Sequence, residues 1–305
     1  MKSPPKRSES FSIIERGDAL GWIWRKVVMT LAQTAARGSG LPSERVALIT
    51  GADRNLGKAM ALSLLRAGAR VVLTAMYGSY LEQVLQEAKA GDRALAIEAD
   101  LAQDKDRQNI LRQALQTFGR IDVLVNNAAV TPETFWPNWL VDGEPRQWTL
   151  DVEFYRNFLE IDCVAPHAFM AAVIPSMLQR GWGRIVNLST SLPTMLRFWP
   201  YGSAKAALEA QTAVLATQLE GSGVTANILA PGGFVKPDPI QLPNGETLNP
   251  DYGPAIMEAP IRWLASNDSN GVNGKRVIAA RWDTAIDPVK GECPAICPIA
   301  WSGLE

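Results

Sequence analysis

The feature that most constrains the fold is a regular alternation of short apolar segments with amphipathic segments from residue 45 to residue 282. The apolar segments predict strands at residues 46–50, 68–74, 94–100, 121–127, 183–189, 224–230 and 275–279. The amphipathic segments predict helices at residues 58–67, 105–118, 154–180 and 202–219. With right-handed crossovers, this order predicts a single-domain, doubly wound α/β fold with about seven parallel strands. Ligands of such sheets bind beyond the carboxyl ends of the strands.

The first predicted strand ends in a glycine-containing turn that is suited to phosphate. Residues 50–57 are Thr-Gly-Ala-Asp-Arg-Asn-Leu-Gly, and a predicted helix follows them at once. The glycines stand where the chain must turn and where a backbone must approach a ligand, and the helix N-terminus directs free N–H groups at that ligand. Tight turns after strands often contain two glycines, so this turn alone is a weak indication of phosphate binding.

The composition excludes several kinds of chemistry. The net charge is −1, so the chain has no overall positive charge to attract nucleic acid. The single histidine, His167, excludes a zinc site built from several histidines, and a Ser-His-Asp hydrolase would depend on it entirely. A lone histidine on a helix more often has a structural role. The three cysteines suit a reducing compartment, so we expect a cytoplasmic protein with no metal site.

Residues 1–44 form a separate N-terminal arm and linker. They hold seven Lys and Arg residues and four acidic residues, a charge of +3 on a nearly neutral protein. A short amphipathic helix is predicted by the spacing of Leu20, Ile23, Trp24, Val27 and Leu31. Its apolar face either packs on this protein or a sister subunit, or makes weak peripheral contact with an anionic membrane. We expect neither a secretion signal nor a segment with the roughly 18 consecutive apolar residues of a membrane span.

Further motifs follow the turn in a fixed order. They are Asp100-Leu101, Asn126-Asn-Ala-Ala129, Gly183-Arg-Ile-Val-Asn187, Tyr201-Gly-Ser-Ala-Lys205 and Asn227-Ile-Leu-Ala-Pro-Gly232. Each motif alone is common, but together they resemble the short-chain dehydrogenase/reductase family over residues 45–282. The resemblance implies a Rossmann-fold catalytic domain at 45–282, a C-terminal tail at 283–305, a nicotinamide cofactor and oxidoreductase activity.

Tyr201 and Lys205 are the expected centre of the chemistry. Side chains four residues apart share one face of a helix. A lysine ammonium beside a phenol favours the phenolate, which lowers the pKa of the phenol from about 10 and makes it a usable proton donor and acceptor. The resemblance implies that Tyr201 exchanges a proton with the substrate oxygen, while Lys205 holds the nicotinamide ribose and tunes the tyrosine.

A hydroxyl residue completes this set. The family usually has a serine three residues after the asparagine of the fifth strand, and counting from Asn187 this position is Thr190. A threonine hydroxyl makes the same hydrogen bond to a carbonyl. Ser189 and Ser191 flank it and are the alternatives, because the loop that leads to Tyr201 is shorter than is usual in the family.

Asp162 stands where the family usually has an asparagine that supports a proton-relay water near the lysine. An aspartate can hold the same water, and its charge would stabilise the Lys205 ammonium. We expect Asp162 to replace the asparagine in the relay. The alternative is a helix residue with no part in it.

The resemblance also implies how the cofactor is bound. NAD-preferring members often carry an acid at the end of the second strand, where this chain has Ala75 and then Met76, and NADP-preferring members often have a basic residue in the turn, where this chain has Arg54. We therefore expect NADP(H) rather than NAD(H). Asn55 replaces the middle glycine of the turn, which asparagine's tolerance of left-handed backbone allows. The expected cofactor-binding residues are Gly51, Asp53, Arg54, Asn55, Leu56, Gly57, Met76, Asp100, Leu101, Asn127, Ala128, Tyr201, Lys205, Pro231, Gly232 and Phe234.

The substrate side is indicated by an aromatic insertion and a proline-rich loop. The insertion lies between Ala129 and Asp162 and holds Phe135, Trp136, Trp139, Trp148, Phe154 and Tyr155. It either lines a site for apolar substrates or packs on the core or a neighbouring subunit. Residues 234–260 hold six prolines and predict a substrate-covering loop. The expected substrate contacts are Ser191, Trp136, Trp199 and Phe234.

Taken together, these residues predict hydride transfer between NADP(H) and a ketone or secondary alcohol on a mid-sized, partly apolar small molecule, with Tyr201 as acid/base. The alternative is a nucleotide-binding regulatory or scaffold protein of the same fold, in which Asp162, Thr190 and Ala129 reduce catalysis. The resemblance also implies a homodimer or homotetramer that assembles through the helices near 154–180 and 202–219.

Overall fold

The computed structural model describes residues 45–131, 134, 146–286, 288 and 293–301. The main sheet consists of β1 (Val46–Thr50), β2 (Arg70–Ala75), β3 (Ala94–Glu98), β4 (Val123–Asn126), β5 (Gly183–Leu188), β6 (Val224–Ala230), β9 (Lys275–Ile278) and β10 (Ile296–Pro298). A separate hairpin consists of β7 (Ile240–Gln241) and β8 (Thr247–Leu248). The arm 1–44 and the insertion residues Phe135, Trp136 and Trp139 lie outside the described residues, so what was expected of them stays a prediction.

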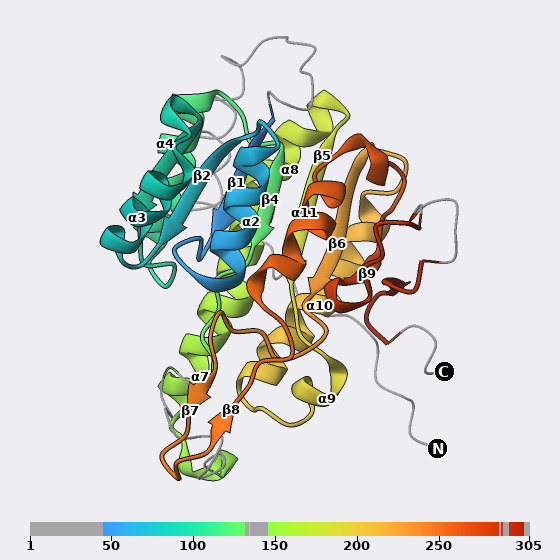
Figure 1. Ribbon diagram of the computed structural model, residues 1–305. Coiled ribbons are helices and arrows are strands. Elements are labelled where there is room, and N and C mark those ends of the chain that lie inside the picture. The colour runs from blue at the N-terminus through green and yellow to red at the C-terminus, as the bar shows by residue number, and fades with distance from the viewer. Residues whose placement is uncertain (1–44, 132–133, 135–145, 287, 289–292, 302–305) are drawn as a thin grey trace, which may run out of the picture.

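The helices cover both faces of the sheet (Figure 1). They are α2 (Asn55–Arg66), α3 (Gly78–Ala88), α4 (Asp104–Phe118), α7 (Val152–Leu159), α8 (Ala165–Arg180), α9 (Leu192–Met195), α10 (Tyr201–Gln218) and α11 (Glu258–Leu264). A π-helical turn, Glu160–Val164, joins α7 to α8. Single 3₁₀ turns lie at Gly91–Arg93, Gln147–Thr149, Pro254–Met257, Asn267–Ser269 and Ala279–Arg281.

The strand order confirms the doubly wound fold. It is β10-β9-β6-β5-β4-β1-β2-β3, and the pairings among β9, β6, β5, β4, β1, β2 and β3 are all parallel. Because β4 and β2 lie on opposite sides of β1, the order reverses there, which is where such sheets open a crevice for a ligand. Parallel pairing also brings the carboxyl ends of β1, β4 and β5 to the same edge, with Asn126 of β4 opposite Asn187 of β5.

Three elements of the sheet region were not anticipated. One is α3, and another is α11, whose first residues were expected to belong to the covering loop. The third is β10, which pairs antiparallel with β9 and extends the sheet into the segment that was expected to be a tail. A strand of three residues within a proline-containing segment is too short to show the alternation by which a strand is recognised in a sequence.

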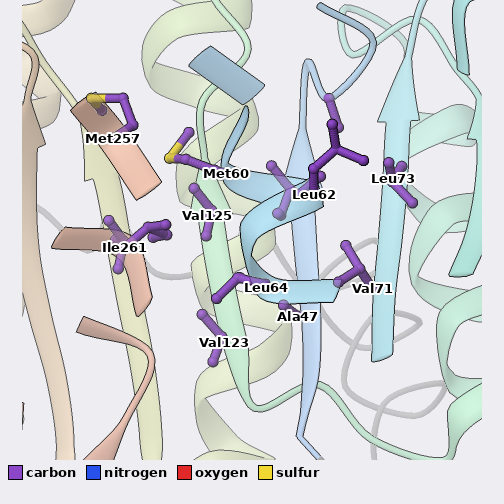
Figure 2. Close-up of a cluster of buried hydrophobic side chains, with 14 of the residues drawn as sticks. Ala47, Met60, Leu62, Leu64, Val71, Leu73, Val123, Val125, Met257 and Ile261 are labelled. Carbon is purple, nitrogen blue, oxygen red and sulfur yellow. The ribbon is translucent and has the colours of Figure 1, made fainter. Parts of the chain in front are cut away.

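The core consists of one apolar layer on each face of the sheet. One layer joins α2, α3 and α11 to the strands, and Figure 2 shows its side chains from α2 gathered over β1, β2 and β4 with Met257 and Ile261 beside them. The other layer joins α4, α8 and α10 to the opposite face. β1, β4, β5 and β6 are buried along their whole length, as the central strands of a parallel sheet covered on both faces are.

The continuous helical stretch Val152–Arg180 corrects one expectation. It is 29 residues long with a mean hydropathy of 1.5 in its most apolar window, so by length and composition a helix of the described part of the chain reaches the limit for a membrane span. Half of that window is buried inside the protein, where Phe169, Met170 and Met177 pack in the apolar layer beneath the sheet. Counting uninterrupted apolar residues missed it because polar residues are interspersed. Core helices meet the same criterion, so the finding is weak evidence for a membrane.

Segments that follow β4, β5 and β6 gather at one end of the molecule. Figure 1 shows α7, α9 and the β7–β8 hairpin together at the lower end of the sheet. The hairpin belongs to the predicted covering loop 234–260. Asp251 accepts a hydrogen bond from the backbone N–H of Phe234 at 2.7 Å, which ties the start of that loop to the segment after the hairpin.

Candidate active site

The turn after β1 is fastened to the end of β4. The Asn127 side-chain amide donates to the carbonyl oxygens of Thr50 and Gly51, each at 2.8 Å. Thr50 Oγ1 accepts from the backbone N–H groups of Asn127 and Ala128, each at 3.0 Å. These four hydrogen bonds hold the turn in shape before any ligand binds.

The same turn leaves the N-terminus of α2 open. Arg54 precedes the helix without a side-chain cap, and its own side chain is 68% exposed and 3.3 Å from Asp53. Asn55 has φ +45, the left-handed backbone that its residue type tolerates, and its side-chain oxygen is buried without a hydrogen-bond partner among the described residues. Uncapped N–H groups at the start of this helix, with a guanidinium beside them, favour an anion.

The predicted pair on α10 does lie together, and Asp162 joins it. Lys205 Nζ is 5.6 Å from the centre of the Tyr201 ring and 2.9 Å from Asp162 Oδ1. The side chain of Lys205 is 2% exposed and that of Asp162 is fully buried. The two side chains form a direct ion pair beside the tyrosine, which is consistent with the expected stabilisation of the Lys205 ammonium by the charge of Asp162. The relay water expected at Asp162 stays a prediction.

Asp162 owes its position to the π-helical turn between α7 and α8. Its second carboxylate oxygen accepts a hydrogen bond from the backbone N–H of Val130, at 2.9 Å, just after β4. Burial raises the pKa of the Asp162 carboxyl above its usual value of 3.8, with the charge of Lys205 and the Val130 hydrogen bond opposing that shift. Single π-helical turns occur often at functional sites.

The structure distinguishes the three hydroxyl groups after β5. Ser189 donates to Glu209 at 3.0 Å, and Ser191 accepts from the backbone N–H of Thr194 at the start of α9. The Thr190 hydroxyl has no hydrogen-bond partner in the described parts of the chain. This difference supports Thr190 as the residue that meets a substrate oxygen, which stays a prediction.

The other expected cofactor residues lie at the carboxyl edge of the sheet. Met76 is exposed after β2, and Asp100 after β3 accepts from the backbone N–H of Ala102 at 2.9 Å. Leu101 is buried in the apolar layer, and Pro231 and Gly232 follow β6, where Gly232 has φ +91. The side chain of His167 is exposed on α8 and forms no hydrogen bond or ion pair with a described residue.

A stacked aromatic pair lies where substrate residues were expected. The rings of Tyr155 on α7 and Trp199, just before α10, have centroids 5.2 Å apart and an interplanar angle of 18°. Sequence reasoning placed Trp199 near the pocket and Tyr155 in the insertion, but it could not pair them, because they come from separate elements.

Comparison with known proteins identifies the family. Residues 45–239 match the sequence profile of the short chain dehydrogenase family. The chain belongs to the short-chain dehydrogenase/reductase family. Members of this family are oxidoreductases that use a nicotinamide cofactor and act on small molecules, and this chain is an NAD(P)-dependent enzyme of that kind.

Named relatives illustrate the range of the family. The chain is 32% identical to a 3-oxoacyl-[acyl-carrier-protein] reductase of Synechocystis over 73% of this chain and 90% of that protein. It is 31% identical to the hydroxynaphthalene reductase-like protein Arp2 of Metarhizium anisopliae, over 77% and 92%. A metagenomic short-chain oxidoreductase solved with NADP is 27% identical, with a TM-score of 0.58 over 73% of this chain and 90% of that one.

The residues of the turn fit the phosphates of a dinucleotide. The evidence is the uncapped N-terminus of α2, the unpartnered oxygen of Asn55 and the exposed guanidinium of Arg54. A Cβ added at Gly57 would lie 2.0 Å from the Gly51 carbonyl oxygen, so only glycine allows the turn to close this tightly.

Gly57→Ala is therefore expected to distort the turn. The added methyl group would also meet the Asn127 side chain at 2.5 Å, so the change should lower the free energy of unfolding by about 1–3 kcal/mol. It should also weaken binding of a nicotinamide dinucleotide in a fluorescence titration. Gly253→Ala is the matched control, because a Cβ there meets no heavy atom within 4 Å. Equal effects of the two substitutions would contradict this account of the turn.

Proposed function

We propose that this protein interconverts a ketone and a secondary alcohol, with NADP(H) as the cofactor and Tyr201 as the acid/base. The observation that carries the proposal is the cluster of Tyr201, Lys205 and Asp162, in which a buried ammonium lies beside the tyrosine ring. The proposed substrate is a mid-sized, partly apolar molecule, which the stacked rings of Tyr155 and Trp199 support.

Each residue of the cluster has a separate role in this proposal. The Tyr201 hydroxyl donates a proton to the substrate oxygen in reduction and accepts it in oxidation. Lys205 favours the phenolate of Tyr201 by its positive charge, and Asp162 holds the ammonium in place. Thr190 donates a hydrogen bond to the substrate oxygen and orients it. When bound, the nicotinamide supplies or accepts the hydride.

The test is NADPH oxidation measured over a panel of carbonyl compounds that includes aliphatic ketones, aromatic ketones and the diketone 9,10-phenanthrenequinone. We expect turnover on at least one aromatic or apolar carbonyl. Cofactor binding without turnover on any member would overturn the proposal.

That outcome would favour the second candidate, a nucleotide-binding regulatory or scaffold protein. Its support is the direct ion pair, because Asp162 engages the Lys205 ammonium that would otherwise be free to hold a ribose. The retained Tyr201 beside Lys205 speaks for the enzyme.

Arg54→Ala tests the proposed preference for NADP(H). In this proposal the exposed Arg54 guanidinium meets the 2′-phosphate that NADPH carries and NADH lacks, and hydrogen bonds between charged partners are the strong ones. We expect the KM for NADPH to rise roughly tenfold and the KM for NADH to change little. Arg66→Ala, at the other end of the same helix, removes an equal charge as a control. A similar rise for both cofactors would contradict the preference.

The proposal includes a cytoplasmic homodimer or homotetramer. Its support is the exposure of apolar side chains on the two helices expected at the interface, Leu178 on α8 and Val214 on α10. Weak membrane contact through the arm 1–44 is proposed from its charge and apolar spacing alone.

A further inference from the structure

A second buried ion pair lies one helical turn beyond Lys205. Glu209 is four residues further along α10, and its side chain is 2% exposed. Arg276 of β9 donates to both carboxylate oxygens of Glu209, to Oε2 at 2.5 Å. Neither residue was singled out from the sequence, since 67 positions separate them.

The pair contacts the segment that contains Thr190, whose hydroxyl is proposed to bind the substrate oxygen. The second terminal nitrogen of Arg276 donates to the backbone carbonyl of Thr190. Glu209 Oε2 accepts from the Ser189 hydroxyl at 3.0 Å, which directs that hydroxyl to the carboxylate. Thus one residue of the pair holds the backbone of Thr190 and the other engages its neighbour.

The pair also joins the C-terminal segment to this network. The backbone N–H of Ala300 donates to Glu209 Oε1 at 3.1 Å, and Arg276 lies opposite Cys297 in the pairing of β9 with β10. The carboxylate therefore receives donors from the residue after β5, from β9 and from the segment after β10, all from within the protein.

A buried ion pair is weak evidence for stability, because desolvation of the two charges offsets their attraction. Such a pair does impose geometry, because each charge must keep its partners. Arg276 has a planar fork that bonds the carboxylate and a carbonyl at once, which a lysine ammonium cannot reproduce with the same geometry.

We propose that Glu209 and Arg276 are positioning residues that set the place of Thr190 relative to Tyr201. Glu209 belongs to the helix that begins with Tyr201, and it holds the Arg276 side chain by the ion pair. Arg276 in turn holds the Thr190 carbonyl by a hydrogen bond, so the position of Thr190 depends on that helix. Because the Ser189 hydroxyl is hydrogen-bonded to Glu209, the Thr190 hydroxyl is the one that contacts the substrate oxygen. The inference rests on the proposed function.

Arg276→Lys is the decisive substitution. It keeps the positive charge and loses the fork, so Thr190 should shift without the loss of the ion pair. We expect kcat with NADPH and 9,10-phenanthrenequinone to fall roughly tenfold to a hundredfold, since displacements of about 1 Å can cost that much. The Kd of NADPH, measured by fluorescence titration, should change little.

Arg180→Lys is the matched control at the opposite end of the sheet. Arg180 also donates to a backbone carbonyl, that of Ile121 at 2.7 Å, and pairs with a buried acid, Asp122, at 3.5 Å. We expect a comparable change in the unfolding temperature and an unchanged kcat. Equal losses of kcat in both variants would overturn the inference.

The double variant Glu209→Leu/Arg276→Met separates positioning from stability. Removal of both charges leaves none stranded, so the unfolding temperature should stay near that of the wild type while kcat stays low. A wild-type kcat in the double variant, or in Arg276→Lys, would overturn this inference and leave the proposed function standing. A wild-type protein that reduces no carbonyl of the panel would overturn the proposed function, and the inference with it.

Discussion

Tyr201→Phe is expected to lower kcat roughly 10²- to 10⁴-fold, the usual contribution of a positioned proton donor. The substitution removes one hydroxyl oxygen and keeps the ring beside Lys205, whose Nζ lies 5.6 Å from the ring centre. Because Lys205 stays paired with Asp162, the site keeps its charges. The variant should therefore bind NADPH with nearly the wild-type Kd and fold with the wild-type unfolding temperature. Steady-state kinetics, fluorescence titration and thermal unfolding measure the three quantities.

Tyr155→Phe is the control for this experiment. It removes a phenol hydroxyl from a ring that stacks on Trp199, two residues before Tyr201, so it lies near the same end of α10. The part of Tyr155 that supports the proposed substrate is its aromatic ring, which the substitution keeps, so we expect kcat to stay near the wild-type value. A similar fall in kcat for both variants, or a Tyr201→Phe protein that still turns over normally, would refute Tyr201 as the acid/base.

Most of the fold could be predicted because it depends on local patterns. The apolar runs 46–50 and 224–230 coincide with β1 and β6, and Asn55 takes the left-handed backbone expected of it. Periodicity and turn chemistry are properties of neighbouring residues, so the sequence displays them directly. The short strand β10 has no such local signature, because its partner β9 determines its conformation.

In the site, too, contacts within one helix could be predicted, whereas contacts between separate elements could not. The spacing of Tyr201 and Lys205 on one helix places them on a common face, and the structure brings them together. Asp162 was singled out as a departure from the family, but its direct contact with Lys205 depends on a π-helical turn that no local pattern indicates. The one signal for Glu209 was an acid on a helix rich in alanine, and nothing nearby in the sequence points to Arg276.

Asp162→Ala is expected to lower the free energy of unfolding by about 3–5 kcal/mol, because it leaves the Lys205 ammonium buried without a partner. The side chain of Lys205 is 2% exposed, so water cannot replace the carboxylate without rearrangement. The Val130 N–H also loses its acceptor. Denaturant unfolding measures the loss. Asp162→Leu/Lys205→Met removes both charges and should recover most of the stability, without recovery of turnover.

The pH dependence of protein stability tests whether burial raises the pKa of the Asp162 carboxyl. Burial raises the pKa of Asp162 above 3.8 in the folded protein, so the folded state holds this proton more tightly than the unfolded state does. The resulting stabilisation is fully present below pH 3.8 and is lost as the pH rises through the folded pKa. Asp162→Asn has no proton to lose. The stability of the wild type relative to Asp162→Asn should therefore decline as the pH rises from about 4. A difference that stays flat or grows with pH would mean that the attraction of Lys205 outweighs burial.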